Sequence, residues 1–192
     1  LLRSMADRWP PAESREGAPD QRIMGAPRRA AADAVAAGKL DPAEALEEAR
    51  GYYIRVAEDW SGTPVGGAAV GAIAETYEAE GRWREAVLAY ERLDREYGQP
   101  DTRPSLWIKL GDLYSGGMRD NVTAAEYYRA VETTYPERPE AGAASISLAR
   151  FDIAAGRFAD ARERLNSVVS KFEEEETLAA TARQHIAMSF EL

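Results

Sequence analysis

The sequence has no cysteine and a single histidine, His185, among its 192 residues. The missing thiols exclude disulfide bonds, thiolate metal sites and cysteine nucleophiles, and one imidazole is too few for a histidine-based metal centre. No glycine-rich phosphate loop follows an expected strand. We therefore predict a protein that is not an enzyme and needs no cofactor or metal, while a mechanism built on serine or carboxylate groups stays open because acids are abundant.

Long apolar runs and basic stretches are scarce as well. No run approaches the roughly 20 apolar residues that a helix needs to cross a bilayer, so these residues alone predict no membrane span. The formal net charge is −9, and residues 1–30 carry six arginines against four acids, which leaves −11 for the rest. An acidic body without a Lys/Arg stripe repels phosphate, so we predict no nucleic-acid partner.

Residues 69–97 have the pattern of a helical hairpin. Apolar residues recur at steps of three and four from Val70 to Tyr77, the pattern breaks at Gly81, and it resumes from Ala86 to Tyr97. Neither helix can bury its apolar stripe alone, so the hairpin must stack on neighbouring hairpins.

Similar segments precede and follow this hairpin. We predict helices over 28–37 and over 42–60, the latter with Asp41 as N-cap and Pro42 at its first position. A hairpin begins near Pro104 with a loop at Gly116–Gly117, another begins after Pro139 and turns at Gly156, and a last helix over 177–190 has no partner behind it. Cutting the chain after Phe172 should therefore lower the melting temperature if that last helix packs as a cap.

The segments repeat with a constant spacing. Ala49, Ala86, Ala124 and Ala161 are 37, 38 and 37 residues apart, and the aromatic residues Trp60, Tyr97, Tyr135 and Phe172 keep the same spacings. Small alanines suit the point where paired helices cross closely, and an aromatic residue at the end of each second helix can fill the gap to the next repeat.

These residues resemble the tetratricopeptide repeat (TPR). The family pattern appears as Trp107, Leu110-Gly111 and Tyr114 on one first helix, and as the turns Gly81-x-Trp83 with Ala86 and Gly156-x-Phe158 with Ala161. The resemblance covers about residues 38–192. It implies an all-α fold, an α-α solenoid of about three TPR-like hairpins with a variant N-terminal hairpin and an unpaired C-terminal helix, together forming a repeat domain over residues 28–192.

Two departures from the family pattern stand out. The middle turn, residues 116–121, carries about one extra residue. In the first hairpin, counting from the turn at Gly38 places Ala43 at the helix crossing, whereas counting back from Trp60 places Ala49 there. We expect this helix to be longer than its counterparts by almost two turns.

Residues 1–27 hold four prolines and two glycines, which prevents a long helix and favours an extended arm. The arm is either disordered or lies on a surface, because its apolar residues exceed those of a typical flexible linker. Trp9 is out of phase with every repeat, and we predict it as an interface anchor.

The resemblance implies partner binding on the concave face that the first helix of each hairpin lines. We place six residues on this first-helix surface: Glu75, Glu78, Ile108, Asp112, Ile146 and Arg150. The alternative for each is a solvated helix face. A family subgroup clamps a chaperone's C-terminal carboxylate with Lys and Asn, but Glu75, Asp112 and Arg150 stand where Asn would be needed, so we reject that clamp. A mildly acidic groove with isoleucines favours a basic or apolar peptide.

The acidic run Glu173–Glu176 suits the start of a helix, so no metal site is predicted there. The endings Glu96–Pro100 and Thr134–Pro139, together with repeats longer than 34 residues, resemble the bacterial cell-envelope branch of TPR proteins. This implies a non-catalytic scaffold, an accessory or assembly subunit of a bacterial envelope or membrane-associated complex, with protein partners. A cytoplasmic adaptor, or a regulatory region of a larger multidomain protein, is the alternative, and Arg3 and Arg8 favour the cytoplasmic side if a membrane helix precedes them.

Overall fold

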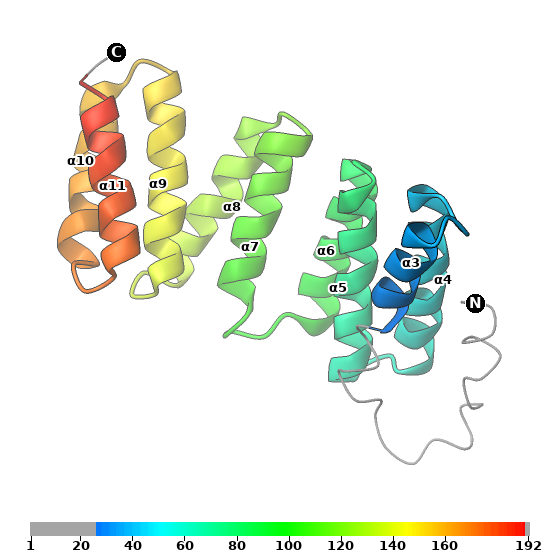
Figure 1. Cartoon of the computed structure of the whole chain (residues 1–192). Coiled ribbons are helices and arrows are strands. Elements are labelled where there is room, and N and C mark those ends of the chain that lie inside the picture. The colour runs from blue at the N-terminus through cyan, green and yellow to red at the C-terminus, as the bar shows by residue number, and fades with distance from the viewer. Residues whose placement is uncertain (1–25, 191–192) are drawn as a thin grey trace. The chain divides into compact units, whose positions relative to one another are not determined.

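The computed structural model of the chain describes residues 26–190. In that range all regular secondary structure is helical, which confirms the all-α prediction. The helices are α3 (Ala26–Ala36), α4 (Pro42–Asp59), α5 (Pro64–Ala79), α6 (Trp83–Tyr97), α7 (Arg103–Asp112), the π-helical turn η2 (Leu113–Gly117), α8 (Asn121–Thr134), α9 (Pro139–Ala154), α10 (Phe158–Lys171) and α11 (Glu176–Met188) (Figure 1). The chain divides into two compact units, Leu1–Gly98 and Gln99–Leu192. The arm predicted over residues 1–27, with Trp9, lies almost wholly outside the described range.

The first unit contains the hairpins α3–α4 and α5–α6, and each helix packs against the next along the chain. Its core lies mainly between α4 and α5, where Tyr53, Val56 and Val70 are at most 1% exposed. The predicted N-cap at Asp41 is confirmed. Asp41 accepts hydrogen bonds from the backbone N–H groups of Ala43 and Glu44 in a capping box, and Thr63 caps α5 ahead of Pro64.

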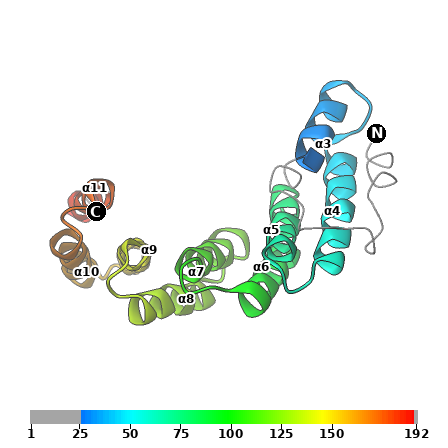
Figure 2. The same cartoon turned by 90° about the horizontal axis from the view of Figure 1, so that it is seen from below.

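The second unit contains the hairpins α7–α8 and α9–α10, followed by α11. In Figure 2, α7, α9 and α11 lie along one side of this unit and α8 and α10 along the other. Helix α9 packs against both α8 and α10. Helix α11 packs on α9 and α10, with Ala179 and Ala182 fully buried, so the last helix docks on the hairpin that precedes it.

The four alanines at the predicted crossings are all completely buried, Ala49, Ala86, Ala124 and Ala161 each at 0% exposure. This confirms the 37–38-residue register. The structure adds a matching set on the first helices, where Ala74 and Ala149 are 0% exposed and Gly111 is buried. A Cβ atom on Gly111 would lie 2.5 Å from the Tyr128 ring, so α7 and α8 approach each other too closely for any side chain there.

The first hairpin resolves the conflict between the two ways of counting. Ala49 is buried and Ala43 is exposed, so counting back from Trp60 is right. Helix α4 has 18 residues, whereas α6 has 15 and α8 and α10 have 14 each. The predicted excess of almost two turns is therefore wrong, because three or four residues add about one turn.

The predicted loop at Gly116–Gly117 is also wrong, because the helix continues there as a π-helical turn. The backbone N–H of Met118 donates to the carbonyl of Leu113 at 3.0 Å, an i to i−5 bond. From the small first-helix residue to the crossing alanine there are 12 residues in α5–α6 and in α9–α10, but 13 between Gly111 and Ala124. The turn absorbs this extra residue, so both helices keep their buried faces.

Two of the aromatic residues at the ends of the second helices, Tyr97 and Phe172, contact the first helix of their own hairpin, a contact that the sequence did not predict. A Cβ atom on Gly67 would lie 3.0 Å from the Tyr97 ring, and one on Gly142 would lie 2.9 Å from the Phe172 ring. Leu178 of α11 lies beside Phe172 at this position, and its Cδ2 atom would be 2.5 Å from a Cβ atom on Gly142. Glycine is needed at these positions because the rings occupy the space of a side chain.

Candidate interaction surfaces

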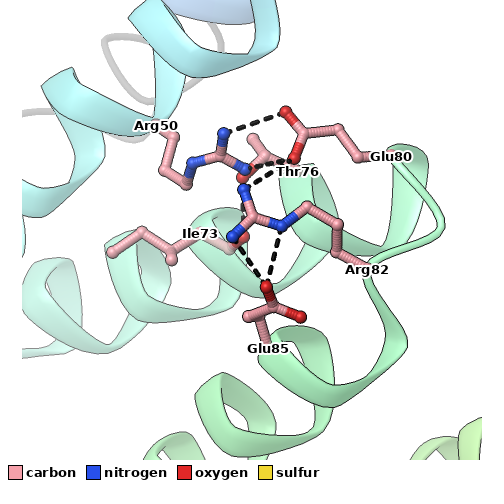
Figure 3. Close-up of polar contacts among 6 residues, drawn as sticks. All are labelled: Arg50, Ile73, Thr76, Glu80, Arg82 and Glu85. Carbon is pink, nitrogen blue, oxygen red and sulfur yellow. Dashed lines mark hydrogen bonds and ion pairs between the residues drawn. The ribbon is translucent and has the colours of Figure 1, made fainter. Parts of the chain in front are cut away.

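An arginine network joins α4 to the α5–α6 turn in the first unit (Figure 3). Arg50 of α4 donates two hydrogen bonds to the carboxylate of Glu80, at 2.8 and 2.9 Å, and both side chains are nearly buried. Arg82 donates to Glu85 at 2.7 and 2.9 Å and lies 3.4 Å from Glu80. The guanidinium carbons of Arg50 and Arg82 lie 4.3 and 4.7 Å from the centre of the Tyr77 ring.

The charges in this network are paired with one another, because each arginine donates to a glutamate of the same network. The bidentate hydrogen bond from Arg50 is the largest influence on Glu80 and lowers the pKa of that carboxyl below its ordinary value, against the opposing effect of burial. Thr76 of α5 is fully buried, and its hydroxyl donates to the carbonyl of Ile73 at 2.7 Å. The Arg50–Glu80 pair therefore holds α4 against the α5–α6 turn and offers little to a partner, whereas Arg82 and Glu85 lie at the surface.

A polar cluster lies where α7, α8 and α9 meet in the second unit. Tyr128 of α8 is 2% exposed, and its hydroxyl donates to the carboxylate of Asp112 at 2.7 Å. Burial and then this hydrogen bond raise the pKa of Tyr128 well above its ordinary value. Ser147 and Arg150 of α9 act on the same hydroxyl in the opposite sense. Tyr90 occupies the equivalent position in the first unit and donates to Glu78 at 3.2 Å.

The structure places the predicted first-helix residues in both units. Glu75 is exposed and Glu78 half-buried on α5, whereas Ile108 is half-buried and Asp112 exposed on α7. Arg150 of α9 is exposed.

Ile146 does not lie on the binding face that the sequence predicted for it. It is 7% exposed and belongs to the core of α9, α10 and α11. Neighbouring residues on an α-helix point in directions about 100° apart. An error of one residue in the assignment is therefore enough to exchange an inward position for a surface position. Ile146 is therefore withdrawn from the first-helix surface, and Trp9 lies outside the described residues.

A second surface, which the sequence did not predict, lies along α9 in the groove between α8 and α10. One depression of about 430 Å³ lies beside the C-terminal half of α9. A second, of about 440 Å³, lies beside its N-terminal half. Arg164 lines both; it donates to Glu132 at 2.8 Å and lies 3.6 Å from Asp152. Ser145 also donates to Glu132.

The depression beside the C-terminal half of α9 is called the basic depression. It is lined by Asn121, Val122, Ala125, Arg129, Leu148, Phe151, Asp152, Ala154, Ala155, Arg157 and Arg164. Sequence reasoning missed it because its arginines come from two hairpins. The only signal along the chain is Arg157 and Arg164, seven residues apart and hence on one face of a helix.

Neither a candidate metal site nor a candidate membrane span is present among residues 26–190. No group of three or more His, Asp or Glu side chains in that range is arranged to hold a metal ion. No helix there is long and apolar enough to cross a membrane.

No protein-family model and no curated protein sequence matches the chain. Solved structures do match it, among them the nearly identical TPR-like repeats of a kinesin light chain-like protein from Podosopora anserina and a single-residue variant of that protein. Each is 21% identical, covers 88% of this chain and superposes with a TM-score of 0.59; the match spans 86% of the parent chain and 85% of the variant. This identity establishes the architecture alone, and the chain accordingly has the all-α hairpin-repeat fold of TPR-like solenoid proteins.

Proposed function

We propose that this protein is a non-catalytic scaffold that binds other proteins. The observation that carries the proposal is the TPR-like repeat fold, because such hairpins bury their small and apolar residues against one another and leave polar faces outward for partners. Arg50 and Tyr128, two buried polar side chains, are engaged by Glu80 and Asp112, so neither is available for catalysis.

We place partner binding on the first-helix surface of each unit, at Glu75 and Glu78 in the first unit and at Ile108, Asp112 and Arg150 in the second. In the second unit, Asp112 is exposed yet held by the hydroxyl of Tyr128, so its carboxylate is presented in one position. Preorganisation of this kind lowers the entropic cost of binding. A basic or apolar peptide is the ligand that these residues favour, and Trp9 in the arm over residues 1–27 is the proposed second anchor.

We further propose that the scaffold is an accessory or assembly subunit of a bacterial envelope or membrane-associated complex. The support is the repeat length of 37–38 residues and the repeat endings Glu96–Pro100 and Thr134–Pro139. The alternative remains a soluble cytoplasmic adaptor, or the regulatory repeat region of a larger multidomain protein.

Affinity purification of the tagged full-length protein, from separate soluble and gently solubilised membrane fractions, tests these proposals. Stoichiometric recovery with the chains of a membrane complex supports the accessory subunit. Recovery with several soluble proteins favours the adaptor, and recovery without any partner from either fraction contradicts the scaffold.

Two variants locate the surface. Asp112→Lys should reduce recovery of the partner, since it reverses a presented charge, and Trp9→Ala should reduce it if the arm is an anchor. Glu47→Lys on α4, an equal charge reversal at an exposed position outside the first-helix surface, should leave recovery unchanged. Full recovery with Asp112→Lys would move the search to another face.

A further inference from the structure

The basic depression combines an apolar floor with a positively charged rim. Leu148 of α9 and Ala125 of α8 are 4% and 7% exposed, and Phe151 of α9 is half-buried beside them. Val122, in the first turn of α8, is 74% exposed at the edge of the same space. A volume of about 430 Å³ is enough for one or two bulky side chains of a peptide.

The charge at the rim is opposite to that of the whole chain. Three arginines line the space, Arg129, Arg157 and Arg164, against the single carboxylate of Asp152. Arg157 donates to Asp152 at 2.6 and 3.0 Å, and Arg164 lies 3.6 Å from its other oxygen. Asp152 is thus already shared by two guanidinium groups, while Arg129 is exposed and forms no ion pair with any residue of the described range. Arg164 also donates to Glu132 at 2.8 Å, so three arginines face two carboxylates and one positive charge remains in excess, in a chain of net charge −9.

We propose that the basic depression binds a short segment of a partner protein in which a bulky apolar side chain is flanked by carboxylates. The apolar side chain would cover Leu148 and Phe151 and reduce the exposure of Val122. A flanking carboxylate would pair with Arg129, whose planar guanidinium suits bidentate recognition. The inference rests on the proposed scaffold function but assigns a second surface, with partner chemistry opposite to that of the acidic first-helix surface.

Charge also argues against occupation by the N-terminal part of this chain. Residues 1–30 carry six arginines and four acids, a net positive segment that the rim would repel. A nucleic acid would meet the three arginines but also the strongly acidic remainder of the chain.

The test is selection of a phage-displayed library of random peptides on the immobilised full chain, followed by fluorescence anisotropy with the selected peptides. We expect enrichment of sequences that place Asp or Glu next to Phe, Leu or Trp. Binding should weaken as salt rises, because exposed charges are screened.

Matched variants assign the site. Arg129→Glu and Val122→Asp should each weaken the binding of the selected acidic–apolar peptides tenfold or more. Arg183→Glu, the same charge reversal at an exposed position of α11, should leave their affinity unchanged. Both test positions are exposed, and an acid at position 122 suits the start of α8, so unchanged circular dichroism and melting temperature are expected.

The outcomes separate this inference from the scaffold proposal. Selected peptides that respond to Asp112→Lys but not to Arg129→Glu would overturn the basic depression and leave the scaffold standing. The same holds if no acidic–apolar peptide is enriched while affinity purification still recovers partners. A single-stranded oligonucleotide that binds tightly and is lost with Arg129→Glu would also overturn it, in favour of a nucleic acid.

Discussion

Single buried residues set how closely the helices of each hairpin approach. The methyl group of Ala124 is completely buried, and neighbouring Gly111 leaves no room for even a Cβ atom against Tyr128. Interiors packed this closely cannot absorb a larger side chain without shifting backbone.

Ala124→Trp tests this crossing directly. The indole should force α7 and α8 apart and lower the free energy of unfolding by about 3 kcal/mol. Urea titration followed by far-UV circular dichroism measures the change, with Glu126→Trp at an exposed site of the same helix as the control. Wild-type stability of the Ala124 variant would show that the repeat register is wrong.

Acid sensitivity is expected from the Arg50–Glu80 pair. The folded-state pKa of Glu80 is lowered from an ordinary value of 4.5, chiefly by the hydrogen bond from Arg50. The unfolded chain therefore binds more protons than the folded one between the two pKa values. The stabilisation is present above about pH 4.5 and is lost as the pH falls through the folded-state pKa.

Glu80→Gln should accordingly cost about 2 kcal/mol of unfolding free energy at neutral pH, since it replaces a charged hydrogen bond. The difference from wild type should shrink as the pH is lowered from 7 toward 3. Urea titrations at a series of pH values check this, with Glu47→Gln at an exposed position of α4 as the control. A difference that stays constant with pH would mean that the pair does not lower the pKa of Glu80.

At the scale of elements, the π-helical turn η2 lets one hairpin hold an extra residue without losing its register. Gly116 is exposed, and a Cβ atom there would meet nothing within 4 Å. Deleting it should restore the 12-residue spacing of the other two hairpins and convert the turn to α-helix.

We therefore expect deletion of Gly116 to leave the urea midpoint close to that of wild type. Deletion of Ala130, inside α8, rotates Val131 and Tyr135 away from their neighbours and should abolish cooperative unfolding. Equal damage from the two deletions would contradict the role assigned to the turn.

Helix α11 covers Gly142 and Phe172 through Leu178, in addition to burying Ala179 and Ala182. Ending the chain after Phe172 exposes that surface and should cost about 3 kcal/mol, which lowers the melting temperature by about 6–12 °C in a chain of this length. Differential scanning calorimetry checks the value. An unchanged melting temperature would show that α11 does not dock in solution.

At the scale of the whole molecule, each of the two units has buried clusters of its own. The α4–α5 core lies within Leu1–Gly98, and the clusters around Leu165 and Val131 lie within Gln99–Leu192. A unit that closes its own core should fold by itself.

Expressed separately, the chains 1–98 and 99–192 should both show helical circular dichroism and a cooperative thermal transition. Linear melting without a transition in either piece would mean that its stability depends on the rest of the chain.

The sequence by itself determined the helices, their caps and the four crossing alanines, because apolar period, capping residues and side-chain size are local properties. Even the extra residue before Ala124 is visible as a spacing, although its form as a π-helical turn is not. Only the tertiary structure decided that Arg50 meets Glu80, and that Ile146 is turned inward. It also decided that Arg129 joins Arg157 and Arg164 around one depression. These outcomes depend on how each helix is rotated against its neighbours, and packing across hairpins sets that rotation rather than the order of residues within one helix.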